Sequence, residues 1–340
     1  MLDTLRASTR VDITYYNVLY GWKGERTKKG IHSISRFIPL SNGAIIYLKL
    51  YTWTQYFVIQ FSASKVLNGD NIDAYDFEKY YFVEKTIEYV INKKLGVRLK
   101  ASDFTLTRLD LNRDFIYNDE ETANKVLRFA RKILPGRCEH RVDYEYGFTS
   151  LTRHATGFRV YRKDKDEHLT EEQQSKMLPT LRFEFQLNRR RIERIFKCRP
   201  SLHQVLTNQM LVSIAWNRVL MLYALDKVIL NKNRLYIEAS KHLTKSDFLV
   251  LKQMNEDPSF NDKDLRKNQL AVIRKLKKAG ICPYSCEVSI QFTISIRHLI
   301  KTLHRKKNEL CIHKKRDRER RNYALIDTNK TVKRWYLDSS

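Results

Sequence analysis

Three segments of the sequence alternate apolar and polar residues, a pattern that predicts β-strands with one polar face. In the segment TLRFEFQLN, leucines and phenylalanines fall on one side, and Arg182 and Glu184 fall on the other. The segments TLTRLDLNRD and GFRVYRK repeat this pattern. Their polar positions include Arg108, Asp110, Asn112, Asp114, Arg159, Tyr161 and Lys163. If these faces belong to one sheet, carboxylates, cations and a phenol converge, and such a set fits attack on a phosphodiester.

Each member of this set has a distinct task in that chemistry. A free tyrosine has a pKa of about 10 and is a weak nucleophile at neutral pH, so it needs a metal-polarised phosphate or a nearby base. Carboxylates such as Asp110 and Glu184 are the ligands that Mg²⁺ or Mn²⁺ prefers. We expect Arg159, Lys163 and Arg182 to neutralise charge that develops on the phosphate, or simply to hold DNA.

The alternative interpretation of the three strands is structural. Half-exposed strands routinely carry charged side chains outward, and an Arg-x-Asp or Arg-x-Glu pair alone is weak evidence of a site. Tyrosine is also abundant, with 19 in the chain, so composition does not select Tyr161 as a nucleophile.

The surrounding elements predict an α+β fold with a central, mainly antiparallel sheet flanked by helices. Residues 12–63 carry four β-rich runs, DITYYNVLY, HSISRFIPL, GAIIYLKLY and QYFVIQFSA. Helical spacing follows at 74–94 and 119–134, with a strand at 103–115 between them. The runs YEYGFTSLTR and GFRVYRKDK are typical of a hairpin. The predicted nuclease domain therefore covers residues 1–200.

The rest of the chain predicts a mainly helical domain over residues 201–312 and a basic tail over 313–340. Within the helical region, the segment 245–281 is a candidate DNA-binding module, although its helices could equally well only pack together. The tail contains HKKRDRERR, which is either a solvated end or an arm that grips phosphates.

The charge of the chain favours a polyanionic partner. The balance of 64 Lys+Arg against 38 Asp+Glu gives a formal net charge of +26, which favours nucleic acid over the alternative of an anionic membrane surface. The most apolar stretch, 210–230, contains Asn217, Arg218 and Asp226, so we expect a buried helix and no membrane span. The N-terminus lacks the apolar core of a signal peptide, and we expect a cytoplasmic protein.

In the order and neighbours of these residues, the chain resembles the gene II/X replication endonucleases of filamentous phages, the inoviruses. Four segments carry the resemblance, with a weaker echo in VIRKLKKAGI. The four are FSASKVLNGDN at 61–71, TLTRLDLNRDF at 105–115, RHATGFRVYRKDKDE at 153–167 and LRFEFQLNRRRIERIF at 181–196.

The resemblance implies that Tyr161 is the nucleophile and Lys163 its companion, and it carries over Arg182 and Glu184. With Asp110 and Glu184 as the expected metal ligands, Asp114 and Glu167 are either further ligands or plain surface charge. We expect DNA contacts from five cations: Arg108, Arg159, Lys65, Arg189 and Arg190.

The reaction implied by the resemblance is rolling-circle replication initiation. Tyr161 attacks one phosphate at the origin of supercoiled duplex DNA, forms a 5′-phosphotyrosyl link, and leaves a 3′-hydroxyl for a host polymerase, with a host helicase and a displaced single strand as further partners. Rejoining then needs no ATP, in agreement with the lack of a phosphate-binding Walker loop. The alternatives are a relaxase with the same tyrosine chemistry and a non-catalytic DNA-binding replication regulator.

The histidines and cysteines are the other residues that could bind a metal. None of the nine histidines forms a His-hydrophobic-His motif, which implies a carboxylate-based site, and His154 and His168 are better explained as DNA contacts or surface residues than as ligands. The set Cys282, Cys286, Cys311 and His313 invites a zinc site, but the spacing is irregular and isolated thiols are the competing interpretation.

Overall fold

The structure is a computed structural model that describes residues 2–11, 21–27, 30–70, 72–132, 138–152, 157–167, 169–223, 225–228, 231–256, 267–286, 288 and 292. These residues form two compact units. The first contains the described residues of 2–110 and 188–214, and the second contains those of 111–187 and 215–292.

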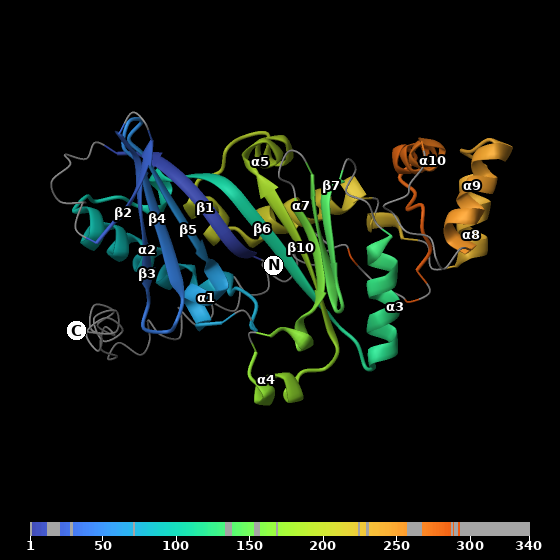
Figure 1. The fold of residues 1–340 in the computed structure, drawn as a ribbon, viewed down its shortest axis with the longest axis horizontal. Helices are drawn as coiled ribbons and strands as arrows, with labels where there is room; N and C mark the ends of the chain where they lie inside the picture. The colour runs from blue at the N-terminus through green and yellow to red at the C-terminus, as the bar shows by residue number, and fades with distance from the viewer. Residues whose placement is uncertain are drawn as a thin grey trace, which may run out of the picture. The chain divides into compact units, whose positions relative to one another are not determined.

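The strands follow the order β2-β3-β4-β5-β1-β6-β10-β9-β8-β7 in an antiparallel, ten-stranded sheet (Figure 1). Strand β6 contributes its residues up to Asp110 to the first unit and those from Leu111 to the second. The strands are β1 Leu2–Arg10, β2 Lys23–Thr27, β3 Gly30–Pro39, β4 Ile45–Tyr51, β5 Tyr56–Ser62, β6 Thr105–Ile116, β7 Cys138–Tyr144, β8 Gly147–Thr152, β9 Gly157–Arg162 and β10 Thr180–Asn188. The predicted α+β class with an antiparallel sheet is confirmed.

In the first unit, one face of the sheet forms the core because alternate residues of each strand are apolar. Leu5 of β1, Leu48 of β4 and Ile59 of β5 are fully buried. The ring of Phe57 in β5 packs edge-on against Phe104, with centroids 5.9 Å apart. Helices belong to this unit as well: α1 Ala63–Asn68, α2 Tyr80–Leu95, α5 Arg189–Phe196 and α6 Leu202–Thr207.

Helix α1 and its two caps occupy residues 62–69, within the segment FSASKVLNGDN, whose signature carried part of the resemblance. Its N-cap, Ser62, accepts a hydrogen bond from the backbone N–H of Lys65, which satisfies a donor that the helix itself leaves unpaired. Its C-cap, Gly69, has φ 89°, a left-handed conformation that favours glycine. The two caps explain why the helix is short and lies between a serine and a glycine. Asn71, the last residue of the signature, lies outside the described residues.

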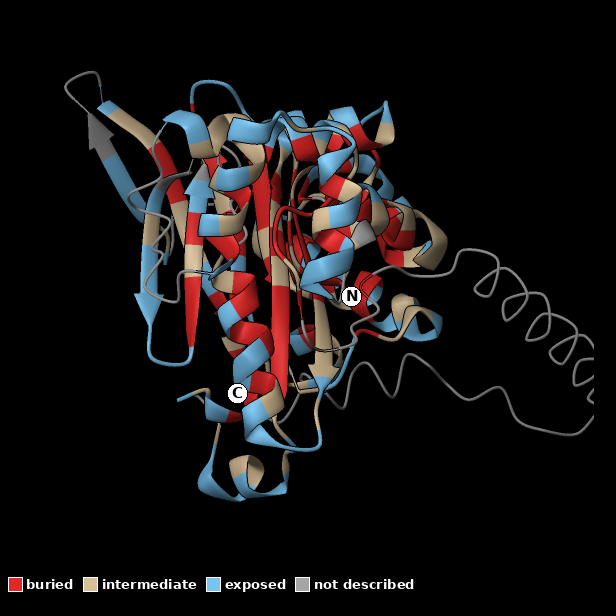
Figure 2. Cartoon of the chain, turned by 90° about the vertical axis from the view of Figure 1, so that its right-hand side faces the viewer, coloured by how far each residue is buried: buried red, intermediate tan, exposed pale blue. Residues whose placement is uncertain are grey.

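In the second unit, helix α7, Gln209–Tyr223, covers the apolar face of the sheet through its residues from 215 onward. The ring of Phe185 in β10 lies 5.2 Å from Trp216 and 5.1 Å from Tyr223. Both aromatic residues of α7 are buried, and Figure 2 shows buried residues along the strands. The apolar stretch that starts at residue 210 is therefore a core helix, as predicted. Two more helices belong here, α3 Glu120–Arg131 and α4 Glu171–Lys176.

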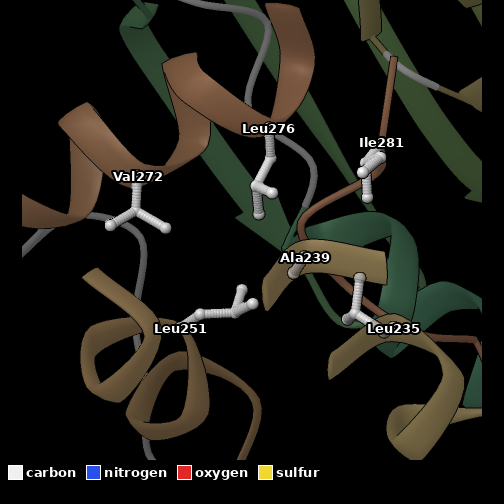
Figure 3. Close-up of a cluster of buried hydrophobic side chains, with 6 residues drawn as sticks. All are labelled: Leu235, Ala239, Leu251, Val272, Leu276 and Ile281. Atoms are coloured by element: carbon white, nitrogen blue, oxygen red, sulfur yellow. The ribbon is translucent and has the colours of Figure 1, made fainter. Parts of the chain in front are cut away.

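Three further helices of the second unit share a separate apolar cluster: α8 Lys232–Ser240, α9 Lys245–Glu256 and α10 Lys267–Lys278. Figure 3 shows Val272 and Leu276 of α10 turned toward Leu251 of α9 and Ala239 of α8. The chain leaves α10 through Gly280, whose φ is 71°. A mainly helical C-terminal region is confirmed for the described residues.

Some of the predicted elements differ from those of the structure, and others lie outside the described residues. The sequence did not predict β1, β2 or β7, whereas the strands and helices expected between 30 and 134 are present with shifted ends. The run DITYYNVLY, Cys311, His313 and the basic tail lie outside the described residues. A domain division after residue 200 stays a prediction. None of the described helices has the length and apolar composition that crossing a bilayer requires.

Candidate active site on strands β9 and β10

The predicted nucleophile lies in the middle of the second unit's sheet, since β9 is paired with β10 on one side and with β8 on the other. In this register Tyr161 is directly opposite Arg182, and Arg159 is opposite Glu184. Residues that are opposite in an antiparallel pair share a face. The period of two therefore brings these four side chains to one face, while Phe158, Val160 and Phe183 fill the core on the other.

The hydroxyl of Tyr161 donates a hydrogen bond of 2.9 Å to Oε1 of Glu184. The second oxygen of Glu184 accepts a bond of 3.3 Å from Nη1 of Arg159, whose side chain is 53% exposed. Burial of the half-buried ring, together with the negative charge of Glu184, raises the pKa of Tyr161 above its ordinary value. The phenol is thus protonated at neutral pH, and a carboxylate lies where it could accept its proton.

A cluster of buried charges lies beside this pair. Asp114 of β6 accepts a bond of 2.6 Å from Nε of Arg182 and one of 2.8 Å from Nζ of Lys163, which directly follows β9. Both cations are almost completely buried. Burial alone would raise the pKa of Asp114, but the hydrogen bonds and charges of Arg182 and Lys163 outweigh it and hold this pKa below its usual range.

The close approach of β8 to β9 depends on a glycine. Gly147 is opposite Tyr161 in the register of β8 and β9. A Cβ atom at residue 147 would lie 2.6 Å from Cβ of Tyr161 and 2.6 Å from the carbonyl oxygen of Val160, closer than such atoms pack. Only glycine fits there without a shift of one of the two strands.

The backbone that carries Tyr161 is fixed from the opposite face. Arg162, the next residue, points into the interior and is 2% exposed. Its guanidinium donates to Asp164 at 2.9 and 2.6 Å and to Oδ1 of Asn124 in α3 at 3.1 Å. Asp164 in turn accepts a 2.9 Å bond from the backbone N–H of Thr180, where β10 begins. The network ties the end of β9 to the start of β10.

The structure brings six predicted site residues together in the second unit, as two hydrogen-bonded groups that are neighbours through strand pairing: Tyr161, Glu184 and Arg159, and Arg182, Asp114 and Lys163. Arg108 and Asp110 form a separate bidentate pair in the first unit, with Nε of Arg108 2.9 Å from Oδ1 of Asp110. Glu167 is exposed. The remaining predicted DNA contacts, Lys65, Arg189 and Arg190, are exposed cations at or near the starts of α1 and α5 in the first unit.

Three of the four carboxylates predicted to bind a metal, all except Glu167, have cationic partners. Arg108 holds Asp110, Arg182 and Lys163 hold Asp114, and Arg159 contacts Glu184. No group of three His, Cys, Asp or Glu side chains suited to a shared metal ion occurs among the residues that the structure describes. These side chains therefore do not form a ready-made metal site, and dependence on Mg²⁺ or Mn²⁺ stays a prediction.

Two of the four residues of the possible zinc site are described. Cys282 and Cys286 are buried free thiols, and burial raises the pKa of Cys282 to about 12. The zinc site stays a prediction, since Cys311 and His313 lie outside the described residues. His154 and His168 lie outside the described residues.

Two residues of the site escaped the sequence reasoning. In the sequence, Gly147 looks like an ordinary turn glycine. The clash that requires glycine there is with a neighbouring strand, β9, and the sequence does not show which strands are neighbours. Arg162 falls on the apolar side of the alternating pattern, between Val160 and the 3₁₀ turn that follows β9. An arginine at an inward position was the available signal, since a charge there must find partners.

Comparison with known proteins adds little. No protein family profile and no curated protein matches the chain. Among solved structures, the rolling circle replication initiator protein from Geobacillus stearothermophilus is similar over 61% of this chain and 78% of its own, with 12% identity and a TM-score of 0.30. A likeness this weak carries no argument about function, which has to rest on the residues themselves.

Proposed function

We propose that the protein is a DNA-nicking and DNA-joining enzyme that starts rolling-circle replication, with Tyr161 as its nucleophile. One observation carries the proposal: the hydroxyl of Tyr161 donates a 2.9 Å hydrogen bond to Glu184 beside an exposed arginine. A phenol, a proton acceptor and a cation next to one another are what transfer of a phosphodiester to tyrosine requires. The surplus of 64 Lys+Arg over 38 Asp+Glu supports a polyanionic substrate.

In the proposed reaction, the phenol oxygen of Tyr161 bonds to phosphorus while the bond from phosphorus to the 3′-oxygen of the DNA breaks. The phenolic proton passes to Glu184, and the leaving 3′-oxygen takes a proton from water. The exposed guanidinium of Arg159 meets the charge on the phosphate oxygens. Arg182 lies opposite Tyr161 on β10, and its positive charge lowers the pKa of Tyr161, which partly opposes the effect of burial.

The covalent link conserves the energy of the broken phosphodiester. A later 3′-hydroxyl can therefore lose its proton to water, displace Tyr161 from phosphorus and rejoin the strand without ATP, while Glu184 returns the proton to the phenol oxygen. Extension of the first 3′-hydroxyl by a host polymerase, helped by a host helicase, belongs to the same proposal. A relaxase of a mobile element would use identical chemistry on a different DNA.

The test is covalent capture of DNA by the full chain. A pool of single-stranded oligonucleotides of random sequence, labelled at the 3′ end, is incubated with the protein, Mg²⁺ and Mn²⁺, and adducts are separated under denaturing conditions and mapped by mass spectrometry. We expect label on the peptide that contains Tyr161. Tyr161→Phe removes the adduct, whereas Tyr146→Phe, a matched change at an exposed tyrosine, leaves it. An adduct on another residue would overturn the assignment.

A non-catalytic DNA-binding regulator is the second candidate, favoured by the raised pKa of Tyr161 and by the ion pairs on the neighbouring carboxylates. Such a protein forms no adduct with any oligonucleotide or supercoiled plasmid, yet binds DNA equally well with tyrosine or phenylalanine at 161. Loss of the adduct in Tyr161→Phe, with DNA affinity retained, separates the two candidates.

A further inference from the structure

The sheet of the first unit has a second face, opposite its core, that carries aromatic rings and arginines. We call it the aromatic face and define it by Arg6 and Arg10 of β1, Phe37 of β3, Tyr47 and Tyr51 of β4, and Tyr56 of β5. Cross-strand pairing places them together: Phe37 is opposite Tyr47, and Tyr56 is opposite both Tyr51 and Arg10. Arg6 lies in the same row as Tyr47, through Gln60.

The rings on this face are available to a ligand. Phe37 is 63% exposed and Tyr56 is 38% exposed. The residues that alternate with them, such as Leu48 and Ile59, are fully buried on the core side, so the exposure belongs to one face only. Along one strand, consecutive residues of the same face are two positions apart, a distance of about 7 Å. Each such position forms a row with its partners on the neighbouring strands, and within one row the ring of Phe37 lies 4.9 Å from that of Tyr47.

Positive charge accompanies the rings. The guanidinium of Arg10 lies 5.5 Å from the centre of the Tyr56 ring, and Nζ of Lys49 lies 5.1 Å from that of Tyr51. The acidic residue paired into this part of the sheet, Glu25 of β2, forms a 2.7 Å ion pair with Lys49. The face therefore keeps the charge of Arg6 and Arg10 for an anionic partner.

We propose that the aromatic face binds single-stranded DNA, with unpaired bases on Phe37 and Tyr56 and phosphates on Arg6 and Arg10. Exposed rings stack on bases that are not already stacked in a duplex, and arginines beside them meet the backbone. Neither a duplex, whose base faces are covered, nor an acidic peptide, which has no bases to stack, uses both features. The choice of DNA rests on the proposed function, which supplies a displaced single strand as substrate and product.

The first experiment measures stacking. Fluorescence anisotropy with labelled oligothymidylate of about 12 nucleotides, a length within the known range for such surfaces, reports the affinity of the full chain. Phe37→Leu and Tyr56→Leu keep an apolar side chain but remove the ring, and each should weaken binding about fivefold or more. Phe82→Leu is the matched control, because Phe82 is 49% exposed on helix α2 and should not matter. Equal affinity of all four proteins would overturn the proposal.

The second experiment measures charge. For single strands, each phosphate contact contributes about 0.7 to the slope of log affinity against log salt. Arg6→Gln and Arg10→Gln should each reduce the slope by about that amount, whereas Lys93→Gln, which removes an exposed cation from α2, should leave it unchanged. Binding of a duplex or of oligouridylate as tight as that of the DNA strand would also overturn the proposal, and unchanged thermal melting shows that each variant is folded.

The outcome is independent of catalysis. The aromatic face does not include Tyr161, so the affinity for oligothymidylate tests this face separately from adduct formation. If no adduct forms with any DNA but Phe37→Leu and Tyr56→Leu still lose affinity, the nicking proposal fails and this one stands. If adducts form on Tyr161 and the two variants bind normally, the reverse holds.

Discussion

Tyr161 lies opposite Arg182 in the register of β9 and β10, yet its hydroxyl donates to Glu184, two residues farther along β10, at 2.9 Å. The tyrosine thus has its positive neighbour across the strand and its proton acceptor on the diagonal. Strand pairing fixes both relationships, because opposite and diagonal neighbours lie within reach of a long side chain.

Replacing Glu184 by Gln should slow adduct formation by roughly 10²- to 10⁴-fold, the usual effect of removing a general base. Glutamine keeps the size of the side chain and its bond to the hydroxyl but does not take the proton at neutral pH. The measurement is the initial rate of adduct formation with a captured oligonucleotide. Glu172→Gln, a change at an exposed carboxylate, is the control, and an unchanged rate for Glu184→Gln would exclude Glu184 as the base.

Replacing Asp114 by Asn should lower the free energy of unfolding at neutral pH by about 3 kcal/mol, since it leaves two buried cations without their counter-charge. The folded-state pKa of Asp114 lies below its ordinary value of about 3.9, so its contribution is complete above that pH and is lost as the pH falls. Urea unfolding at neutral pH and near pH 3 should therefore give a difference between wild type and variant that shrinks in acid.

The matched control for Asp114→Asn is Glu172→Gln, which removes an ion pair with Lys176 whose partners are 78% and 72% exposed. Exposed pairs contribute little to stability. A loss of stability as large as that of Asp114→Asn would contradict the argument from burial.

Replacing Gly147 by Ala should abolish most adduct formation and destabilise the fold by about 1–3 kcal/mol, the range for overpacked sites. The added methyl group meets Cβ of Tyr161 at 2.6 Å, so β8 or the tyrosine has to move. Gly24→Ala in β2 is the control, since a Cβ there has Ile31 as its nearest neighbour at 3.8 Å. Equal activity and equal melting temperature for both variants would show that β8 moves without consequence.

The raised pKa of Tyr161 predicts that its phenol ionises later than an exposed tyrosine as the pH increases. Because the folded-state pKa is raised, the stability contributed by the protonated phenol is present below about pH 10 and is lost as the pH rises further. Ultraviolet difference titration of the wild type against Tyr161→Phe isolates this one phenol among 19 tyrosines. A transition at or below the pH of free tyrosine would contradict the predicted direction.

Removal of divalent metal should stop adduct formation, and Mg²⁺ or Mn²⁺ should restore it, because a bound cation would take up charge on the phosphate oxygens. Binding of Mn²⁺, followed by electron paramagnetic resonance, provides a readout besides activity. Full activity in a chelator would instead assign the neutralisation of charge to Arg159, Arg182 and Lys163.

Alternation along a strand was sufficient to predict which residues share a face, because that pattern depends on the strand alone. The polar faces of β9 and β10 were predicted in this way, as was the core position of Phe183. Register was not predictable, since it depends on which strand is the neighbour, and so the ion pairs of Asp114 and the need for glycine at 147 became visible only in the structure. β1 was missed because LDTLRASTR has few of the large β-branched and aromatic residues that mark strands.

The anchoring of Arg162 has a mechanical consequence for the proposed intermediate. DNA linked to Tyr161 would be attached to β9, a β-strand that is hydrogen-bonded to neighbours on both sides. The next residue, Arg162, is held by Asp164 and Asn124. Tension on that DNA would be resisted by the hydrogen bonds of β9 to two neighbouring β-strands, instead of by those of an edge strand or a loop. The tether point would therefore resist pulling while the new strand is copied.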